Sequence, residues 1–261
     1  MRIINELNIR TNDKKPEFQF RAILFIDLLG FKSAIDKSVD DEELFKKIHS
    51  AVNSLYRAKD ENYKGPLLGK DFGVEISVFS DSLVISKDLN DSGSFYYLLN
   101  IAYFTIIEIL SSGFLARGAI TIGKLYHNKK VIFGPAINNA YLLESKCAIY
   151  PRVIVEKEIV EKMLLENHLN EIDEERKWYE KLLKEDEDGL QFIDFLSPYH
   201  QFDDFEEYCW LLGKIKELIL TGMNSDNNLS VRQKYIWLKN YFNNTLDQLI
   251  INSESLPTKI I

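Results

Sequence analysis

Residues 22–31 read Ala-Ile-Leu-Phe-Ile-Asp-Leu-Leu-Gly-Phe, a short apolar run that ends in Asp27 and continues as Leu-Leu-Gly-Phe. An apolar run of four to eight residues that is rich in branched and aromatic side chains and bounded by a turn signal is typical of a buried strand. The sequence therefore predicts a buried strand that delivers the Asp27 carboxylate to its C-terminal end.

A second acid is predicted on a turn. Residues 73–79 and 83–86 are β-rich runs separated only by Ser80-Asp81-Ser82. Two such runs joined by so short a connection form an antiparallel hairpin. We expect Asp81 at the tip of this hairpin.

The remaining elements of the first half complete a recognisable order. Apolar residues at helical spacing predict helices over residues 41–56 and 94–110. Residues 114–126 read as a long strand that turns at Asn128-Lys129 and pairs with residues 131–133. The order β-α-β-β-α-β, with two crossover helices on one face of a mainly antiparallel sheet, is the ferredoxin-like arrangement. The expected fold class is therefore α+β.

The second half is predicted to be mostly helical. We expect an N-terminal segment over residues 1–18, a core over 19–155 and a helical extension over 156–261 that packs on the core. Within these bounds the expected elements are a helix over 136–145, a strand over 152–155, a helix over 156–167, a solvated charged stretch over 171–186, an edge strand over 189–195, and helices over 202–221 and 231–251.

Composition excludes several classes of protein. The formal charge is −8, with 32 basic and 40 acidic residues, which argues against a nucleic-acid binder. The run from Phe95 to Leu110 is shorter than the roughly 20 residues that cross a bilayer, and no signal sequence is visible. The two cysteines have no partner at metal spacing. We expect a cytoplasmic protein that does not insert into membranes.

The two acids point to divalent metal chemistry. The predicted topology places Asp27 and Asp81 side by side, and a pair of metal ions held by acids can activate an attacking oxygen and neutralise a leaving phosphate. Leu29-Gly30-Phe31 would offer backbone N–H groups to a triphosphate. The alternative is that both acids only cap turns. A zinc site is not expected, because the four histidines lack partners at ligand spacing: His49, His127, His168 and His200.

Four sequence blocks resemble the class III nucleotidyl cyclases. They occur in the family's order over residues 22–155. The blocks are Phe25-Ile-Asp-Leu-Leu-Gly-Phe31, Ser80-Asp81 at the family's Gly-Asp position, Arg117-Gly-Ala-Ile-Thr-Ile-Gly123, and Gly134-Pro-Ala-Ile-Asn-Asn-Ala-Tyr-Leu-Leu-Glu-Ser145.

The resemblance implies a reaction and a set of site residues. Asp27 and Asp81 would bind two Mg²⁺ or Mn²⁺ ions, with the Leu28 carbonyl as a further ligand. The ribose 3′-hydroxyl would attack the α-phosphate and release pyrophosphate, a step dominated by positioning and electrostatics. Asn138 matches the residue that orients the ribose. The family's sites form between two protomers, so a homodimer with shared active sites is implied.

The departures from the family concern the base and the transition state. Ser77 and Val131 stand where purine cyclases carry a Lys and an acid that read the base. A site without these hydrogen-bonding partners should lose discrimination toward purines. Leu142 stands where the family has its transition-state Arg. We nominate three cations as its replacement: Arg117, Lys124 and Arg152.

These features look closest to the pyrimidine cyclases of the bacterial Pycsar anti-phage systems. This closer resemblance implies conversion of UTP, or next of CTP, to a cyclic monophosphate that a separate effector reads. The alternative is a catalytically silent nucleotide-binding regulator, since Leu142 replaces the transition-state cation. A diguanylate cyclase is not favoured, because residues 79–82 read Phe-Ser-Asp-Ser rather than Gly-Gly-acid-acid-Phe.

Overall fold

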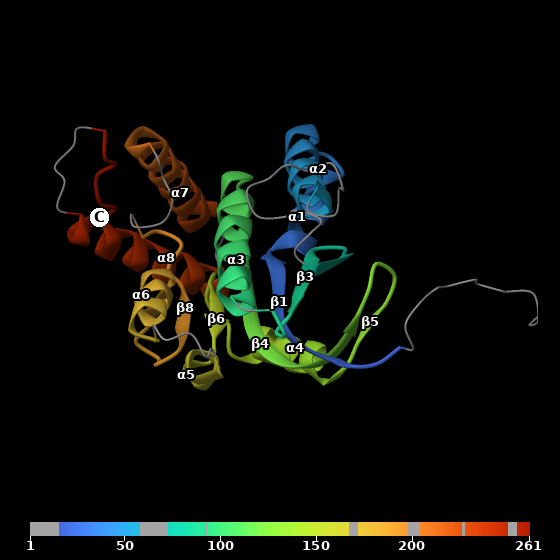
Figure 1. Ribbon diagram of the computed structural model, residues 1–261. Helices are drawn as coiled ribbons and strands as arrows, with labels where there is room; N and C mark the ends of the chain where they lie inside the picture. Colours follow the sequence, from blue (N-terminus) through green and yellow to red (C-terminus); the bar gives the residue numbers. More distant parts are fainter. Residues whose placement is uncertain are drawn as a thin grey trace, which may run out of the picture.

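The computed structural model describes residues 16–57, 73–91, 93–166, 172–197, 204–225, 228–249 and 255–261. Most of the expected N-terminal segment, together with His168 and His200, lies outside the described residues. The structure confirms the α+β class (Figure 1).

The first half forms the expected ferredoxin-like core. A first crossover contains two helices where the sequence predicted one, because the short α1 directly follows the glycine turn. The four strands lie in the order β2-β3-β1-β4 and every neighbouring pair is antiparallel. The elements are β1 (Gln19–Leu29), α1 (Phe31–Ser38), α2 (Glu42–Arg57), β2 (Val74–Phe79), β3 (Ser82–Asp88), α3 (Ser94–Ser111) and β4 (Leu115–His127).

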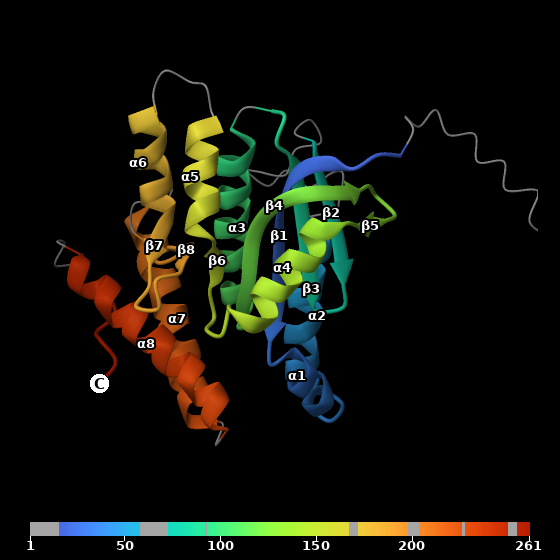
Figure 2. The ribbon, with the colours of Figure 1, turned by 90° about the horizontal axis from the view of Figure 1, so that it is seen from below.

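Strand β1 is covered on both faces, which explains its continuous apolar sequence. Ala22, Leu24 and Ile26 belong to the main core, which also contains α3. Ile23 and Phe25 point to the opposite face and pack in a second core with residues of α4 (Pro135–Lys146). Seen from below, α4 lies across β1 and its neighbours (Figure 2). A buried central strand of this kind fixes where Asp27 emerges.

The second half extends the same sheet. Strand β6 pairs in parallel with β4, and β8 and β7 follow it in the order β4-β6-β8-β7. The strand expected at the sheet edge is therefore an inner strand, and β7 forms the edge instead. The elements are β5 (Ile132–Phe133), β6 (Val153–Val155), α5 (Lys157–Glu166), α6 (Ile172–Leu182), β7 (Leu183–Glu185), β8 (Gln191–Ile193), α7 (Phe205–Ser225) and α8 (Leu229–Gln248).

The charged stretch over 171–186 is not only a solvated face. It forms α6 and β7, and α6 buries Tyr179 and Leu182 in the main core. The apolar pattern of α6 was masked by its many Lys and Glu residues. The main core is continuous from β1 to α8, so the extension packs directly on the first half.

Helix α3 has the length and hydropathy of a membrane span, with a mean hydropathy of 1.3 over 18 residues. However, 61% of this window is buried inside the protein. Its side chains pack on the sheet and on α6 and α7. This packing is that of a core helix, as the sequence predicted.

Candidate active site

Asp27 lies near the end of β1, between two strands that supply its partners. In the sheet register it faces Ser82 on β3 and Arg117 on β4. The Ser82 hydroxyl donates to Asp27 Oδ1 at 3.2 Å, and Arg117 Nη2 lies 3.8 Å from Asp27 Oδ2. The strand pairing, rather than chance rotamers, brings these three side chains together.

Asp81 occupies the turn of the β2–β3 hairpin, as expected, next to Asp27. Its carbonyl accepts a hydrogen bond from the Leu28 amide at 3.2 Å. Burial raises the pKa of Asp27, and the negative charge of Asp81 raises it further; Arg117 and the Ser82 hydroxyl act in the opposite direction. Two carboxylates that repel each other in a partly buried position form an arrangement that a cation would stabilise.

The hairpin turn contains a strained residue. Ser80 has φ of 57°, the one non-glycine residue with positive φ in the described part of the chain. The first central position of such a two-residue turn normally holds glycine. Replacing Ser80 by Gly should therefore raise the free energy of unfolding by about 1 kcal/mol, less the entropy that glycine loses on folding. Urea unfolding measures this difference, and an unchanged or lower midpoint would show that the turn is not strained.

Glu144, on α4, completes the acidic cluster, and the sequence did not single it out as a site residue. Its Oε1 is 2.5 Å from Arg117 Nε, an ion pair by proximity that lacks hydrogen-bond alignment. Only 3% of the Glu144 side chain is exposed. Burial raises its pKa to about 7; the charge of Arg117 lowers the pKa and that of Asp27 raises it. Arg117 thus lies between two carboxylates, those of Asp27 and Glu144, which compete for its positive charge.

Glu144 should make stability fall as pH rises. Its pKa is about 7 in the folded protein against the ordinary 4.5, so the folded state binds the proton more tightly than the unfolded chain. The resulting stabilisation is complete below pH 4.5 and is lost as pH rises through about 7, a change of up to about 3 kcal/mol. Glu144→Gln should flatten this part of the curve in chelator-treated protein. If the free energy of unfolding, measured by urea, changed with pH in the same way for both proteins, the raised pKa of Glu144 would be contradicted.

The two carboxylates of Asp27 and Asp81 fit an open site for Mg²⁺ or Mn²⁺ better than a closed structural metal site. Among the described residues no group of three or more His, Cys, Asp or Glu side chains could hold a metal ion. Mg²⁺ is commonly bound by one or two carboxylates together with water and substrate phosphates. The pair of Asp27 and Asp81 suits such an open site. The contribution of the Leu28 carbonyl stays a prediction.

The glycine turn after β1 presents backbone donors. Gly30 has φ of 76° and precedes α1, whose N-terminus has no side-chain cap. The side chain of Phe31 is buried and that of Leu29 packs against the core. These two residues can therefore offer only their backbone to a ligand, and their role in substrate binding stays a prediction.

Ser77 and His127 form a buried polar chain away from the acids. Oγ of Ser77 lies 2.9 Å from Nε2 of His127, and Nδ1 of His127 lies 2.7 Å from Oγ of Ser86. Nε of Arg21 donates to the same Ser86 oxygen at 2.9 Å. His127, which is isolated in the sequence, is thus the hydrogen-bond partner of Ser77, a predicted site residue.

One protomer does not bring all the predicted site residues together. Val131 is 47% exposed and follows the far end of β4. The ten residue steps from Arg117 to His127 correspond to at most about 33 Å of strand, and β4 bends so that His127 contacts Ser77 on β2. Asn138 is exposed on α4, six residues before Glu144 and so about 9 Å from it along the helix axis. The residues expected at the base and ribose therefore lie on other elements than the acid pair.

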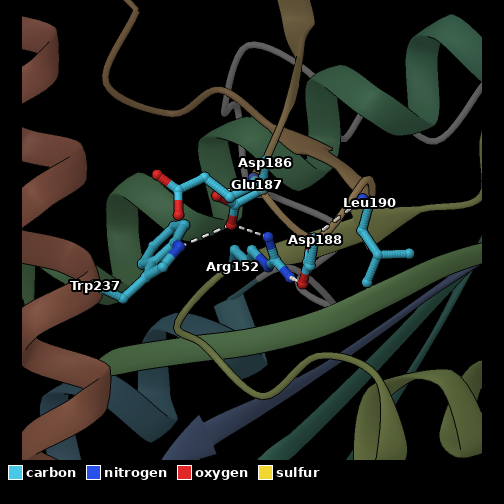
Figure 3. A network of polar contacts seen from close by, with 6 residues as sticks. All are labelled: Arg152, Asp186, Glu187, Asp188, Leu190 and Trp237. Carbon is cyan, nitrogen blue, oxygen red and sulfur yellow. Dashed lines mark hydrogen bonds and ion pairs between the residues drawn. The ribbon is translucent and has the colours of Figure 1, made fainter.

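The cations nominated to replace the family's Arg have very different positions. Leu142 is 44% exposed on α4, Lys124 is exposed on β4, and Arg117 is at the acidic cluster. Arg152 is completely buried: Asp186 and Asp188 bind its guanidinium (Figure 3). The nomination of Arg152 is therefore wrong, because two carboxylates distant in sequence already neutralise it.

Comparison with known proteins yields structural similarity only. No protein-family model and no curated protein matches the sequence. The adenylyl cyclase CyaB from P. aeruginosa is similar with a TM-score of 0.39 and 12% identity, over 69% of this chain and 96% of that chain.

Two further solved structures are similar. The catalytic core of a rhodopsin-guanylyl cyclase with converted specificity, in complex with ATPalphaS, has a TM-score of 0.40 and 15% identity, over 57% of this chain and 82% of that one. A class III adenylyl cyclase-like ATP-binding protein from Pseudomonas aeruginosa has a TM-score of 0.41 and 10% identity, over 56% of this chain and 35% of that one.

Proposed function

We propose that the protein is a metal-dependent nucleotidyl cyclase that converts UTP to 3′,5′-cyclic UMP and pyrophosphate, with CTP as the next most favoured substrate. The observation that carries this proposal is the pairing of Asp27 with Asp81 beside Arg117, at the end of a buried strand and next to an uncapped helix N-terminus. The four cyclase-like sequence blocks contain these residues.

The reaction is an intramolecular phosphoryl transfer. The ribose 3′-oxygen forms a bond to the α-phosphorus, the bond to the bridging oxygen breaks, and pyrophosphate leaves with the electron pair while the hydroxyl proton passes to solvent. Two Mg²⁺ or Mn²⁺ ions, when bound, would lower the pKa of the hydroxyl and neutralise the phosphates. Asp27 and Asp81 hold that charge, Arg117 binds a phosphate oxygen, and the amides after Gly30 orient the triphosphate.

The buried polar chain is compatible with a pyrimidine substrate and with UTP. Two donor arrangements satisfy these contacts, and the proposal takes the one in which Ser86 donates to His127 Nδ1 and His127 Nε2 donates to Ser77. The Ser77 hydroxyl then keeps its own hydrogen for an acceptor. Uracil presents a carbonyl at position 4, where cytosine presents an amino group. This polarity favours UTP if Ser77 reads that edge of the base.

A homodimer with shared sites would bring the separated groups together. Asn138 and the base-side residues of one protomer would approach the acidic cluster of the other. Apolar side chains are exposed on elements that border these residues, and such exposure is typical of an interface. They are Phe79 on β2, Phe133 on β5, and Tyr141 and Leu142 on α4.

The resemblance to the Pycsar cyclases supplies the biological setting of the proposal. The cyclic nucleotide would act as a second messenger in anti-phage defence, made in the cytoplasm and read by a separate effector. The negative net charge of −8 is consistent with a small-molecule substrate rather than a nucleic acid.

A silent nucleotide-binding regulator is the alternative, and Leu142 favours it. An apolar side chain replaces the family's transition-state Arg, and loss of such a charge ordinarily costs orders of magnitude in rate. A binder of this kind would still hold a nucleotide at Asp27 and Asp81. Turnover by purified protein separates the two proposals.

The test is product analysis by chromatography with mass detection. Pure protein is incubated with ATP, GTP, CTP and UTP separately in Mn²⁺, beside an Asp27→Ala control. Cyclic UMP, absent from the control, is the expected product, and cyclic CMP would leave the pyrimidine proposal standing. Cyclic AMP or cyclic GMP as the sole product would overturn the inference from Ser77 and Val131. Binding of nucleotide without turnover would establish the regulator instead.

A further inference from the structure

Lys234 is a half-buried lysine on helix α8. No residue in the described part of the chain forms an ion pair or a hydrogen bond with its side chain. An ammonium group that loses hydration without gaining a partner destabilises the fold. Its position therefore calls for an explanation outside folding.

The contacts of Trp237 fix helix α8 against strand β6. Trp237 Nε1 donates to Asp186 Oδ2 at 2.7 Å (Figure 3). The Trp237 ring stacks on Tyr150 with centroids 5.6 Å apart and planes within 7° of parallel. The Arg152 guanidinium lies 5.7 Å from the centroid of the same ring. Lys234 precedes Trp237 by three residues, so it lies one helical turn away on the same side of α8.

Strand β6 in turn lies beside the Arg117 end of β4. The amide of Gly118 donates to the Arg152 carbonyl at 3.1 Å, and Gly118 pairs with Val153 in the sheet register. Arg117 directly precedes Gly118. The contacts from Arg117 through Arg152 to Trp237 thus connect α8 to the start of β4, where the acidic cluster lies. In agreement, burial lowers the pKa of Lys234 and the charge of Arg117 lowers it further.

We propose that Lys234 is a substrate-binding residue that holds a phosphate oxygen of the triphosphate beside Arg117; this inference rests on the cyclase function proposed above. In that site Asp27 and Asp81 would hold the divalent ions, and Glu144 pairs with Arg117. Among the described residues, Lys234 then has no protein group that neutralises its charge. A compact ammonium on a flexible stem is well suited to bind a phosphate oxygen.

The assignment also gives the extension a role in the site. Leu142 carries no charge, Lys124 lies toward the distal half of β4, and Arg152 is enclosed by two carboxylates. The cation that the core lacks would come from α8, more than 90 residues further along the chain than Leu142. Helix α8 would therefore be part of the catalytic unit.

The test measures ligand binding by calorimetry, using Lys234→Met with Lys239→Met as the matched control on the same helix. The probes are 3′-deoxy-UTP, which lacks the attacking hydroxyl, inorganic tripolyphosphate, and uridine, which carries no phosphate, each with Mg²⁺. Lys234→Met should weaken binding of the first two by about tenfold or more, the loss of one charged hydrogen bond. Uridine binding should not change, and Lys234→Arg should restore most of the affinity.

A thermal melt of the metal-free protein adds a readout that does not depend on a ligand. Lys234→Met should raise the melting temperature, because it removes a half-buried charge without a partner. Unchanged tripolyphosphate affinity in Lys234→Met, or an equal loss in Lys239→Met, would overturn the role of Lys234 alone. If the wild-type protein binds neither triphosphate probe, the proposed function fails and this inference fails with it.

Discussion

Asp27→Asn is expected to lower cyclic nucleotide formation by at least about a thousandfold. A carboxylate that holds a catalytic divalent ion supplies several kcal/mol of transition-state stabilisation, and each 1.36 kcal/mol is tenfold in rate. The amide has the same shape and can still accept the hydrogen bond that the Ser82 hydroxyl donates to Oδ1. The loss would therefore come from charge and not from a disturbed strand. Initial rates of product formation at saturating Mn²⁺ measure it.

The same variant should make the metal-free protein more stable at neutral pH. Burial and the charge of Asp81 raise the pKa of Asp27 in the folded state. An acid with a raised pKa destabilises the fold when it is ionised, so stability falls as pH rises through that pKa. Asn removes the charge and with it this penalty. Opposite effects on activity and melting temperature are typical of functional sites.

A matched control separates the site from general charge effects. Asp36 is an exposed acid on the nearby helix α1. It carries the same carboxylate as Asp27, but it lies outside the acidic cluster. Asp36→Asn should change neither the rate nor the melting temperature by more than the experimental error. Asp81→Asn should reproduce the loss of activity. Retention of more than a tenth of the rate in Asp27→Asn would exclude the acid pair as the reaction site.

The parts of the site that the sequence predicts depend on local signals. Asp27 ends an apolar run, and Asp81 lies between two β-rich runs, so strand and turn preferences alone place both residues. The ferredoxin-like order brings them together without any knowledge of side-chain packing. The same local logic gives the glycine turn after β1.

The parts that the sequence missed depend on contacts between distant elements. His127 has no partner nearby in the chain, because its hydrogen-bond partners are 41 and 50 residues away. Glu144 becomes a site residue only because one face of α4 packs on β4. In the sequence alone Arg152 is a cation without a partner. In the fold, the β7–β8 hairpin brings Asp186 and Asp188 to it from 34 and 36 residues away. No periodicity or motif in a single sequence records such pairings.

Arg152→Met is expected to lower the free energy of unfolding by about 3–5 kcal/mol, the cost of breaking a buried ion pair from one side. The Arg152 guanidinium is fully buried between Asp186 and Asp188 (Figure 3). The centroids of the Tyr150 and Trp237 rings lie 5.4 Å and 5.7 Å from it. Methionine fills part of the space but leaves Asp186, whose side chain is 16% exposed, without a counter-ion. Urea unfolding at neutral pH measures the loss.

The double variant Arg152→Met with Asp186→Asn tests the cause of that loss. If an uncompensated carboxylate is responsible, removing its charge should recover much of the stability, since residues that share an ion pair are not additive. Asp188 is 42% exposed and can regain hydration, so Asp188→Asn should recover less. A loss under about 1 kcal/mol in Arg152→Met would mean that the ion pairs do not hold the β7–β8 hairpin to β6, because surface pairs contribute no more than that. Trp237 and Arg152 both bind the Asp186 carboxylate. If Arg152→Met lowers the free energy of unfolding by this amount, it should therefore also loosen the packing of α8 and weaken the binding of tripolyphosphate through Lys234.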